Sequence, residues 1–260
     1  DIAEGFDLSV GPLVRLTVLQ LSEDTFFQIW STHHLIIDGW STNRVLYEFD
    51  QYYKSLIGNK QTILNAPEPF SHYIAWLDQV DRETSISYWK NYLSGYETKA
   101  FLPFDSDGMS TDTTYLASDY EFWLDKELTE KLTDLASKEK TTLNTIIQSA
   151  WGVLLSRYNN TQDVVFGSVV SGRPSQLKDI QEMIGIFINT VPQRVSYSGQ
   201  TTFKDLLQSI HQSFIAGEPH HYLSLAEIQR QSDLGSNLID QLLIFENYPI
   251  SGQAEDAIEP

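Results

Sequence analysis

Residues able to carry chemistry stand together near the start of the chain, where His33-His34 is followed by three apolar residues and then by Asp38-Gly39. The histidines come at the end of a strand-like run, and the Asp-Gly pair opens a turn into a helix. Neighbouring side chains of a strand point to opposite faces, so one imidazole can face a cleft while the other contacts the scaffold. An imidazole titrates close to neutral pH, which suits one histidine to general base catalysis.

Two other interpretations of the same residues stay open at this point. A hydrogen-bonded histidine pair, with Asp38 as a turn or helix-cap residue, would have only a structural role. Two imidazoles and a carboxylate could also bind zinc or iron. The metal site is disfavoured because neighbouring strand residues diverge and no HxD or ExxH spacing nearby offers a third ligand, so we expect no metal.

The composition of the 260-residue chain narrows the classes of protein. Its 17 Lys and Arg against 35 Asp and Glu give a formal net charge of −18, which disfavours binding to nucleic acid. The absence of cysteine excludes a disulfide framework, a thiolate nucleophile and a Cys-ligated zinc site. No apolar run reaches the roughly 18 residues needed to cross a bilayer, and residues 1–4 do not resemble the start of a signal peptide. We expect a cytoplasmic protein that binds neither nucleic acid nor a membrane.

The segments around the histidines predict a hairpin followed by helices. Apolar residues alternate in 13–19 and again in 26–37, which is typical of two paired strands. From Ser41 the period changes to that of a helix, which ends at Gly58. A second amphipathic stretch covers about 70–93. These elements would place the histidines at the junction of a strand and a helix.

Strands and helices alternate in the second half of the chain, which predicts an α/β fold in layers. The predicted elements are a strand at 119–124, a helix around 128–135, a helix capped by Thr142, strands at 164–170 and 186–197, a helix at 202–216 with Phe203 inward, and a last strand at 238–248. Residues 94–118 are rich in Ser, Thr, Asp and Gly and predict a connector between two lobes.

The segment from Ser31 to Ser41 as a whole, with its His-His-x-x-x-Asp-Gly-Trp-Ser pattern, resembles the signature of condensation domains from nonribosomal peptide synthetases. Ile184 to Arg194 (IGIFINTVPQR) closely resembles the Gly-x-Phe-x-Asn-Thr-x-x-x-Arg motif of that family. SHYIAWL at 71–77, HHYLSL at 220–225 and FENYP at 245–249 are similar to further segments of the family, and they come in the same order. The resemblance covers essentially the whole chain.

The resemblance implies the two-lobe layered α/β fold of chloramphenicol acetyltransferase, with an incomplete N-terminal lobe because the first motifs of the family lie upstream of Asp1. On this basis residues 1–100 are the remainder of the N-terminal lobe and carry the HHxxxDG motif. Residues 101–118 are the connector, and 119–260 are a C-terminal lobe truncated at its end.

The resemblance also implies a reaction, the formation of an amide from a donor acyl thioester and the amine of an acceptor aminoacyl thioester. His34 is the catalytic residue by analogy, either as the base or by positioning the amine. Backbone N–H groups at Asp38-Gly39-Trp40 are candidate donors to the thioester oxygen. The supporting residues at the site are predicted to be His33, Asp38, Gly39, Trp40, Ser41, Asn189, Arg194 and Arg173. Asp38 would pair with an arginine from the second lobe, Arg194 or Arg173, while Asn189 braces the backbone.

The partners implied are an upstream donor and a downstream acceptor peptidyl carrier protein, with an adenylation domain in the same polypeptide. Their 4′-phosphopantetheine arms carry the substrates, and this chain binds no cofactor itself. The two retained histidines disfavour a cyclisation domain, and Trp40 before Ser41 with Thr42 after it favours condensation over epimerisation. An epimerisation-type domain, another carrier-dependent acyltransferase of this superfamily and a non-catalytic docking module of the same fold stay as alternatives.

Overall fold

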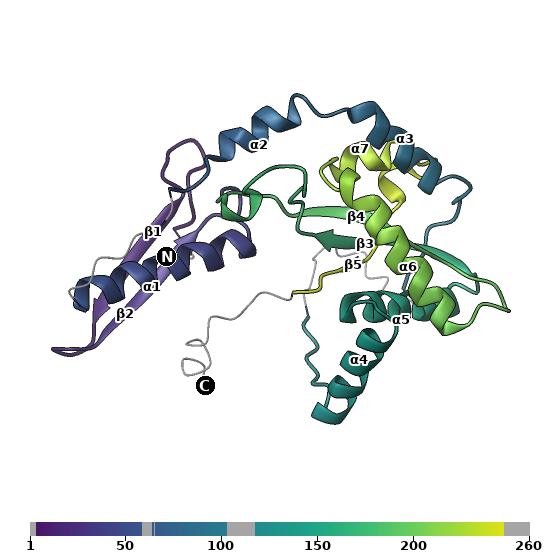
Figure 1. Ribbon diagram of the computed structural model, residues 1–260, viewed down its shortest axis with the longest axis horizontal. Coiled ribbons are helices and arrows are strands. Elements are labelled where there is room, and N and C mark those ends of the chain that lie inside the picture. The colour runs from purple at the N-terminus through teal and green to yellow at the C-terminus, as the bar shows by residue number, and fades with distance from the viewer. Residues whose placement is uncertain (1–3, 59–63, 65, 103–117, 247–260) are drawn as a thin grey trace, which may run out of the picture. The chain divides into compact units, whose positions relative to one another are not determined.

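The computed structural model describes residues 4–58, 64, 66–102 and 118–246, and these form two compact units (Figure 1). Unit 1 consists of the described residues up to Val80 together with Ser171–Ile188 and Glu246. Unit 2 consists of the described residues of Asp81–Val170 and Asn189–Phe245. None of the described helices is both long enough and apolar enough to cross a membrane.

Unit 1 is built on the predicted hairpin and helix. Strands β1 (Val14–Gln20) and β2 (Phe26–Thr32) pair antiparallel, and helix α1 (Gly39–Ile57) follows. The second strand is shorter than predicted, because the chain turns at His34–Ile36 instead of remaining extended. Trp30 of β2 packs edge-on against Phe49 of α1, with ring centroids 5.2 Å apart.

The amphipathic stretch at 70–93 is two helices, because a helix cap interrupts it. Helix α2 (Phe70–Leu77) belongs to unit 1, and α3 (Arg82–Tyr92) belongs to unit 2. Between them Asp81 accepts hydrogen bonds from the backbone N–H groups of Glu83 and Thr84, which fixes the start of α3.

Unit 2 is a three-stranded sheet in the order β4-β3-β5 with helices packed on it. Strand β3 (Asp163–Val170) runs antiparallel to β4 (Asn189–Ser196) and parallel to the short β5 (Leu242–Leu243). The other helices are α4 (Lys126–Lys138), α5 (Leu143–Tyr158), α6 (Phe203–Gly217) and α7 (Leu225–Gln229), with 3₁₀ turns at Ile180–Glu182 in unit 1 and at Glu218–His220 and Gly235–Asn237 in unit 2. The predicted cap Thr142 accepts a hydrogen bond from the first turn of α5, and Thr202 does the same at the start of α6.

Three predicted features of unit 2 are wrong. Residues 119–124 form no strand, and their side chains are exposed, with Trp123 91% accessible. The last strand is only two residues long, and Phe203 is exposed instead of inward. A strand needs a partner to satisfy its backbone, and 119–124 has none among the described residues.

The predicted boundary between the lobes lies mostly outside the described residues, since only 101, 102 and 118 of the 101–118 connector are described. Two other segments are grouped differently from the predicted lobes. Trp89, Leu93 and Tyr96 lie in the core of unit 2, whereas Ser171–Ile188 packs with unit 1. The chain therefore returns to unit 1 at Ser171–Ile188, and this second passage brings side chains to the histidine motif.

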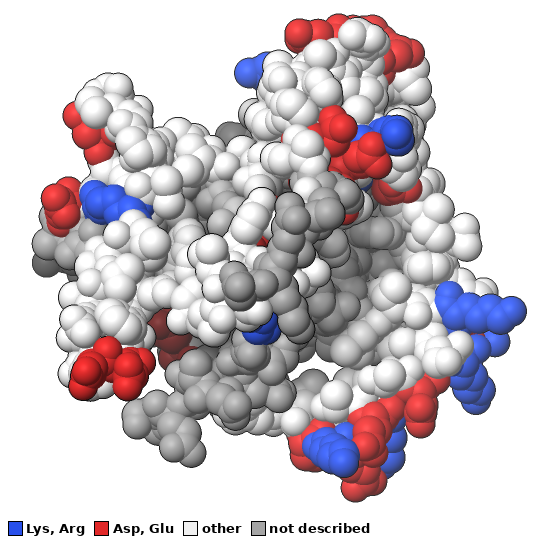
Figure 2. Space-filling model, turned by 60° about the vertical axis from the view of Figure 1, so that its left-hand side comes forward, with Lys and Arg blue, Asp and Glu red and all other residues white. Residues whose placement is uncertain are grey.

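Unit 1 exposes many apolar side chains on its hairpin. Leu19 and Phe27 face each other across the strands and are 45% and 55% accessible. Leu16, Val18 and Phe26 are similarly exposed. On the face of the molecule in Figure 2, charged side chains gather in separate groups with wide uncharged areas between them.

Candidate active site

The first histidine of the motif is tied into the turn that follows β2. The backbone N–H of His33 donates to the carbonyl of Leu13 at 3.0 Å, which extends the hairpin by one bond. Its ring nitrogen Nδ1 accepts from the N–H of Leu35 at 3.0 Å, and its ring meets the edge of Phe6. His33 is half-buried. These contacts join His33 to the hairpin and to the turn that follows it.

The second histidine is presented to an open depression. His34 is exposed and is the first residue of the turn. A hydrogen bond from the N–H of Ile36 to the carbonyl of His33, 3.2 Å long, closes this turn. The depression has a volume of about 240 Å³ and is lined by Thr32, His34, Ile37, Asp38, Gly39, Thr42 and Asn43. The imidazole is therefore accessible to a reactant.

Asp38 is the buried anchor of this turn. One carboxylate oxygen, Oδ1, accepts from the N–H of Ser41 at 2.8 Å, which makes Asp38 the N-cap of α1. The other, Oδ2, accepts from the N–H of Phe187 at 2.9 Å. Because Phe187 belongs to the second passage of the chain through unit 1, the carboxylate joins that segment to the histidine turn.

The arginine that pairs with Asp38 is Arg173. Its Nη2 lies 3.7 Å from Oδ1 of Asp38, and the two side chains are 1% and 0% accessible. Arg173 also donates to the carbonyls of Ile180 and Met183, and its guanidinium lies 4.0 Å from the centre of the Phe187 ring. Burial lowers the pKa of Arg173, and the neighbouring carboxylate opposes that shift. An arginine stays charged under these conditions, so this is a buried ion pair.

Ser41 connects the same groups through its hydroxyl, which is fully buried. Its Oγ donates to the carbonyl of Gly185 at 2.9 Å, and it accepts from Nη2 of Arg173 at 2.8 Å and from the N–H of Gly185 at 3.2 Å. We call Asp38, Ser41, Arg173 and the backbone of Gly185 and Phe187 the anchor network. It fixes the first turn of α1 against the 171–188 segment.

Arg194 and Asn189 are engaged elsewhere, in unit 2. The Arg194 guanidinium pairs with Asp163, with Nη2 and Oδ2 2.6 Å apart, and that hydrogen bond raises its pKa. Asn189 donates from Nδ2 to the carbonyls of His221 and Leu223, both at 2.7 Å. The structure therefore gives Arg194 a different partner from Asp38, and Asn189 braces backbone.

Sequence reasoning missed two kinds of site residue. Gly185 and Phe187 belong to a motif that the sequence does indicate, but they contact the histidine turn through their backbone, and the motif gives no signal of that role. Asn43 lines the depression from the second turn of α1, and no hydrogen-bond partner for its carboxamide is found in the part of the chain that is described. The sequence signal that could have identified Asn43 as a site residue is its position two residues after Ser41, at the start of the predicted helix.

The N-terminal end of α1 gives the depression its electrostatic character. The N–H of Asp38 donates to the carbonyl of Gly185 at 3.3 Å, so it is unavailable as a donor to a reactant. Within the described ranges the N–H of Gly39 has no such acceptor. The positive end of a helix dipole favours negative charge at this point. Among the described residues no group of three or more His, Cys, Asp or Glu could hold a metal ion.

Comparison of the sequence with known families and proteins identifies relatives of the whole chain. The Condensation domain family matches residues 1–259. The chain is 38% identical to Gramicidin S synthase 2 of Brevibacillus brevis over 94% of its length and 6% of the synthase. It is 39% identical to Tyrocidine synthase 2 of Brevibacillus parabrevis, over 94% of the chain and 7% of that synthase. The chain thus spans a small part of each relative.

Solved structures show the same fold at lower sequence identity. The first condensation domain of the CDA synthetase matches 92% of this chain with a TM-score of 0.71 and 16% identity, and the chain covers 54% of it. The starter condensation domain of rhizomide synthetase RzmA matches 94% with a TM-score of 0.73 and 16% identity, and the chain covers 55% of it. These matches confirm the predicted condensation-domain architecture, and the chain spans about half the length of each of these solved domains. The chain belongs to the condensation-domain family of nonribosomal peptide synthetases.

Proposed function

We propose that this chain contributes the histidine site of an amide-forming condensation reaction. The nitrogen of an acceptor amine attacks the carbonyl carbon of a donor acyl thioester. A C–N bond forms, the C–S bond breaks, and the donor's thiol leaves with a proton. The amine gives up one proton in total, and His34 either takes that proton or holds the amine in line.

The observation that carries this proposal is the contrast between the two histidines. His34 is exposed beside the depression, whereas His33 is tied to the backbone by its ring nitrogen. A free α-amino group titrates at roughly 7.7–8.0, so much of it is protonated at neutral pH, and an imidazole held beside it can act as a general base. The family shown by the whole-chain match supports the same reaction.

The N-terminal end of α1 supplies the second part of the site. Attack on the thioester places negative charge on its oxygen, and the N–H of Gly39 is available at the start of the helix. One well-placed donor to such an oxygen is worth roughly 3–4 kcal/mol. Holding two tethered reactants in line can contribute up to about 7–11 kcal/mol. Orientation is therefore at least as important as proton transfer.

The substrates would come on the phosphopantetheine arms of a donor and an acceptor carrier protein. The chain has no cysteine, so it offers no thiol to hold the acyl group itself. The synthetases that it resembles are many times longer than this segment, which supports partners within a larger assembly. An adjacent adenylation domain and a cytoplasmic location belong to the same proposal.

The test is amide formation between two loaded carrier proteins, with the chain studied in the polypeptide in which it occurs. His34→Ala should slow single-turnover product formation by about 10²–10⁴-fold. His72→Ala is the matched control, because His72 is an exposed histidine of unit 1 whose ring is hydrogen-bonded to Glu68, and it should leave the rate unchanged. A wild-type rate for His34→Ala would refute the proposal. Binding of both carrier proteins by the wild type without any amide product would also refute it, because that is the behaviour of a non-catalytic docking module.

A further inference from the structure

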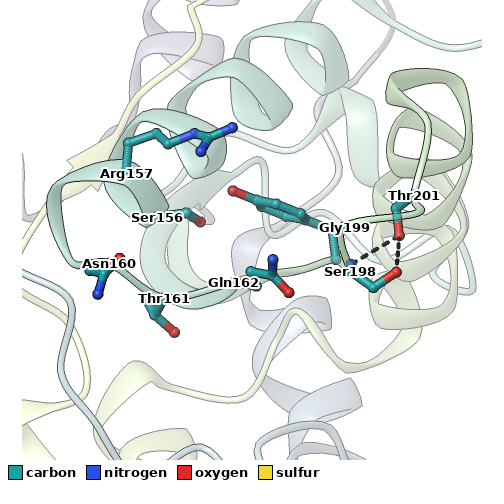
Figure 3. Close-up of a pocket in the computed structure, with 9 residues that line it drawn as sticks. Ser156, Arg157, Asn160, Thr161, Gln162, Ser198, Gly199 and Thr201 are labelled. Atoms are coloured by element: carbon teal, nitrogen blue, oxygen red, sulfur yellow. Dashed lines mark hydrogen bonds between the residues drawn. The ribbon is translucent and has the colours of Figure 1, made fainter.

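A second cavity lies in unit 2, apart from the histidine depression. It has a volume of about 710 Å³, within the range of small-ligand sites. It is lined by Ser156, Arg157, Asn160, Thr161, Gln162, Tyr197, Ser198, Gly199 and Thr201. Figure 3 shows Arg157, Asn160 and Thr161 at the end of α5 and in the turn after it, opposite the loop that leads into α6.

The two walls of this cavity are fixed by their own hydrogen bonds. The N–H of Tyr197 donates to the carbonyl of Gln162 at 3.0 Å, which joins the turn after α5 to the loop after β4. In that loop the N–H of Ser198 donates to Oγ1 of Thr201 at 3.0 Å (Figure 3). The cavity is therefore preformed by backbone contacts and does not depend on an occupant.

Several polar side chains of the lining have unused hydrogen-bonding capacity. No hydrogen bond or ion pair involves the side chains of Arg157, Asn160 or Gln162, nor the hydroxyl of Tyr197, within the described part of the chain. Arg157 is the sole charged residue in the lining, and no carboxylate lies among the nine residues. In a chain of net charge −18, this is a locally cationic cavity.

The carboxylate of Asp163, the residue that directly follows the lining residue Gln162, is paired with an arginine. Both of its oxygens accept from the Arg194 guanidinium, at 2.8 and 2.6 Å. A guanidinium binds the oxygens of phosphate and carboxylate through parallel hydrogen bonds, and amides and hydroxyls complete such sites. We propose that this cavity binds a small phosphate-type oxyanion through Arg157, assisted by Asn160, Gln162 and Tyr197.

The proposed oxyanion site is separate from the reaction at His34. The cavity lies where β3 begins and β4 ends, since Asp163 pairs with Ser196. The chain enters the anchor-network segment at the opposite end of the strand, after Val170. None of the nine lining residues lines the histidine depression or belongs to the anchor network. The proposed ligand is therefore distinct from the reactants of amide formation.

The experiment is a titration of the polypeptide in which the chain occurs, at constant ionic strength, with inorganic phosphate, with glycerol 3-phosphate and with neutral glycerol, followed by hydrogen–deuterium exchange. Saturable protection of the peptides that contain Asn160 and Gly199 with either phosphate, and none with glycerol, is expected. Tighter binding of one phosphate probe identifies the free anion or the monoester as the better ligand. Response to glycerol alone, or to none of the three, overturns the proposal.

Two arginine variants separate this site from general charge effects. Arg157→Gln should weaken phosphate binding by at least about tenfold. Arg230→Gln is the matched control, since Arg230 is also exposed, lies in unit 2 and has no ion pair among the described residues. A cation in the last turn of α5 also stabilises the helix, so the free energy of unfolding is measured alongside. Equal weakening in both variants, or unchanged binding in Arg157→Gln, contradicts the assignment.

Discussion

At the scale of single residues, the histidine turn depends on charges placed where water cannot reach them. Asp38 and Arg173 lose their hydration, and their attraction offsets that cost only because five further groups donate to or accept from them. Such a pair contributes less to stability than to geometry. Breaking it is costly, because the remaining charge stays buried without a partner.

Removing one member of this pair should therefore destabilise unit 1 more than removing both. Asp38→Asn is expected to cost about 3–5 kcal/mol of unfolding free energy. Asp38→Asn combined with Arg173→Met should recover part of that loss, as measured by urea denaturation. If the double variant were less stable than the single one, the buried ion pair would not be the source of the effect.

His221 should make unit 2 sensitive to acid. Burial lowers its pKa to about 4, and the charge of the neighbouring His220 adds to that shift. The unfolded chain takes up this proton near pH 6.5, so the stabilising contribution is present above that value. It is lost as the pH falls from about 6.5 to about 4, by roughly 3 kcal/mol in total.

The measurement is the free energy of unfolding against pH for the wild type and for His221→Phe, which keeps an aromatic ring beside Trp89 and Phe214. The variant should lose most of the slope between pH 6.5 and 4, whereas His72→Gln should keep it. A slope unchanged by His221→Phe would assign the acid sensitivity to other groups.

At the scale of elements, the contact between α2 and the 171–188 segment determines whether the anchor network can form. Phe70, Tyr73 and Phe187 pack together, with ring centroids of Phe70 and Phe187 5.1 Å apart. Gly185 passes so close to Phe70 that an added Cβ would lie 2.2 Å from its ring. A side chain at this position would displace the backbone that Ser41 contacts.

Gly185→Ala is therefore expected to destabilise unit 1 by roughly 1–3 kcal/mol. Gly199→Ala is the control, because a Cβ there meets no atom within 4 Å, and its effect should stay within about 0.5 kcal/mol. In a Phe70→Leu background the cost of Gly185→Ala should shrink. A cost that is independent of residue 70 would rule out the proposed clash.

Elements with local signals could be predicted from the sequence, and those that depend on distant partners could not. The Asp38 cap and the change of period at Ser41 define α1, and Thr142 defines the start of α5. The strand pattern at 119–124 is a local signal too, but a strand forms only beside a partner. Arg173 and Arg194 were equal candidates for the ion-pair partner of Asp38. The local sequence around each arginine does not show that 171–188 packs with unit 1.

At the scale of the whole molecule, net charge and exposed apolar surface have opposite effects on the association of copies of this chain. The charge of −18 keeps copies apart, and its effect weakens as salt screens it. The β1–β2 hairpin has exposed apolar residues on both faces and unpaired edges within the described residues, which favours association. The chain also spans only about half the length of solved condensation domains.

The isolated chain is therefore expected to self-associate, more strongly at high salt, in sedimentation velocity experiments. Leu19→Lys together with Phe27→Lys should reduce this association, because both lie exposed on one face of the hairpin. Ile215→Lys, an exposed apolar position on α6 of unit 2, is the control and should change little. A monomer at every concentration and salt tested would contradict this expectation.

In the proposed function, His34 acts on the reacting amine, and the anchor network acts through His34 by holding its turn in place. The most direct test is the single-turnover rate of amide formation for His34→Ala, Ser41→Ala and the double variant, at saturating loaded carriers. Ser41→Ala should slow the reaction because it releases the turn, and the double variant should be no slower than His34→Ala alone. If the rate losses of the two single variants multiplied in the double variant, Ser41 would act independently of His34, which contradicts this mechanism. A wild-type rate for His34→Ala would also contradict it.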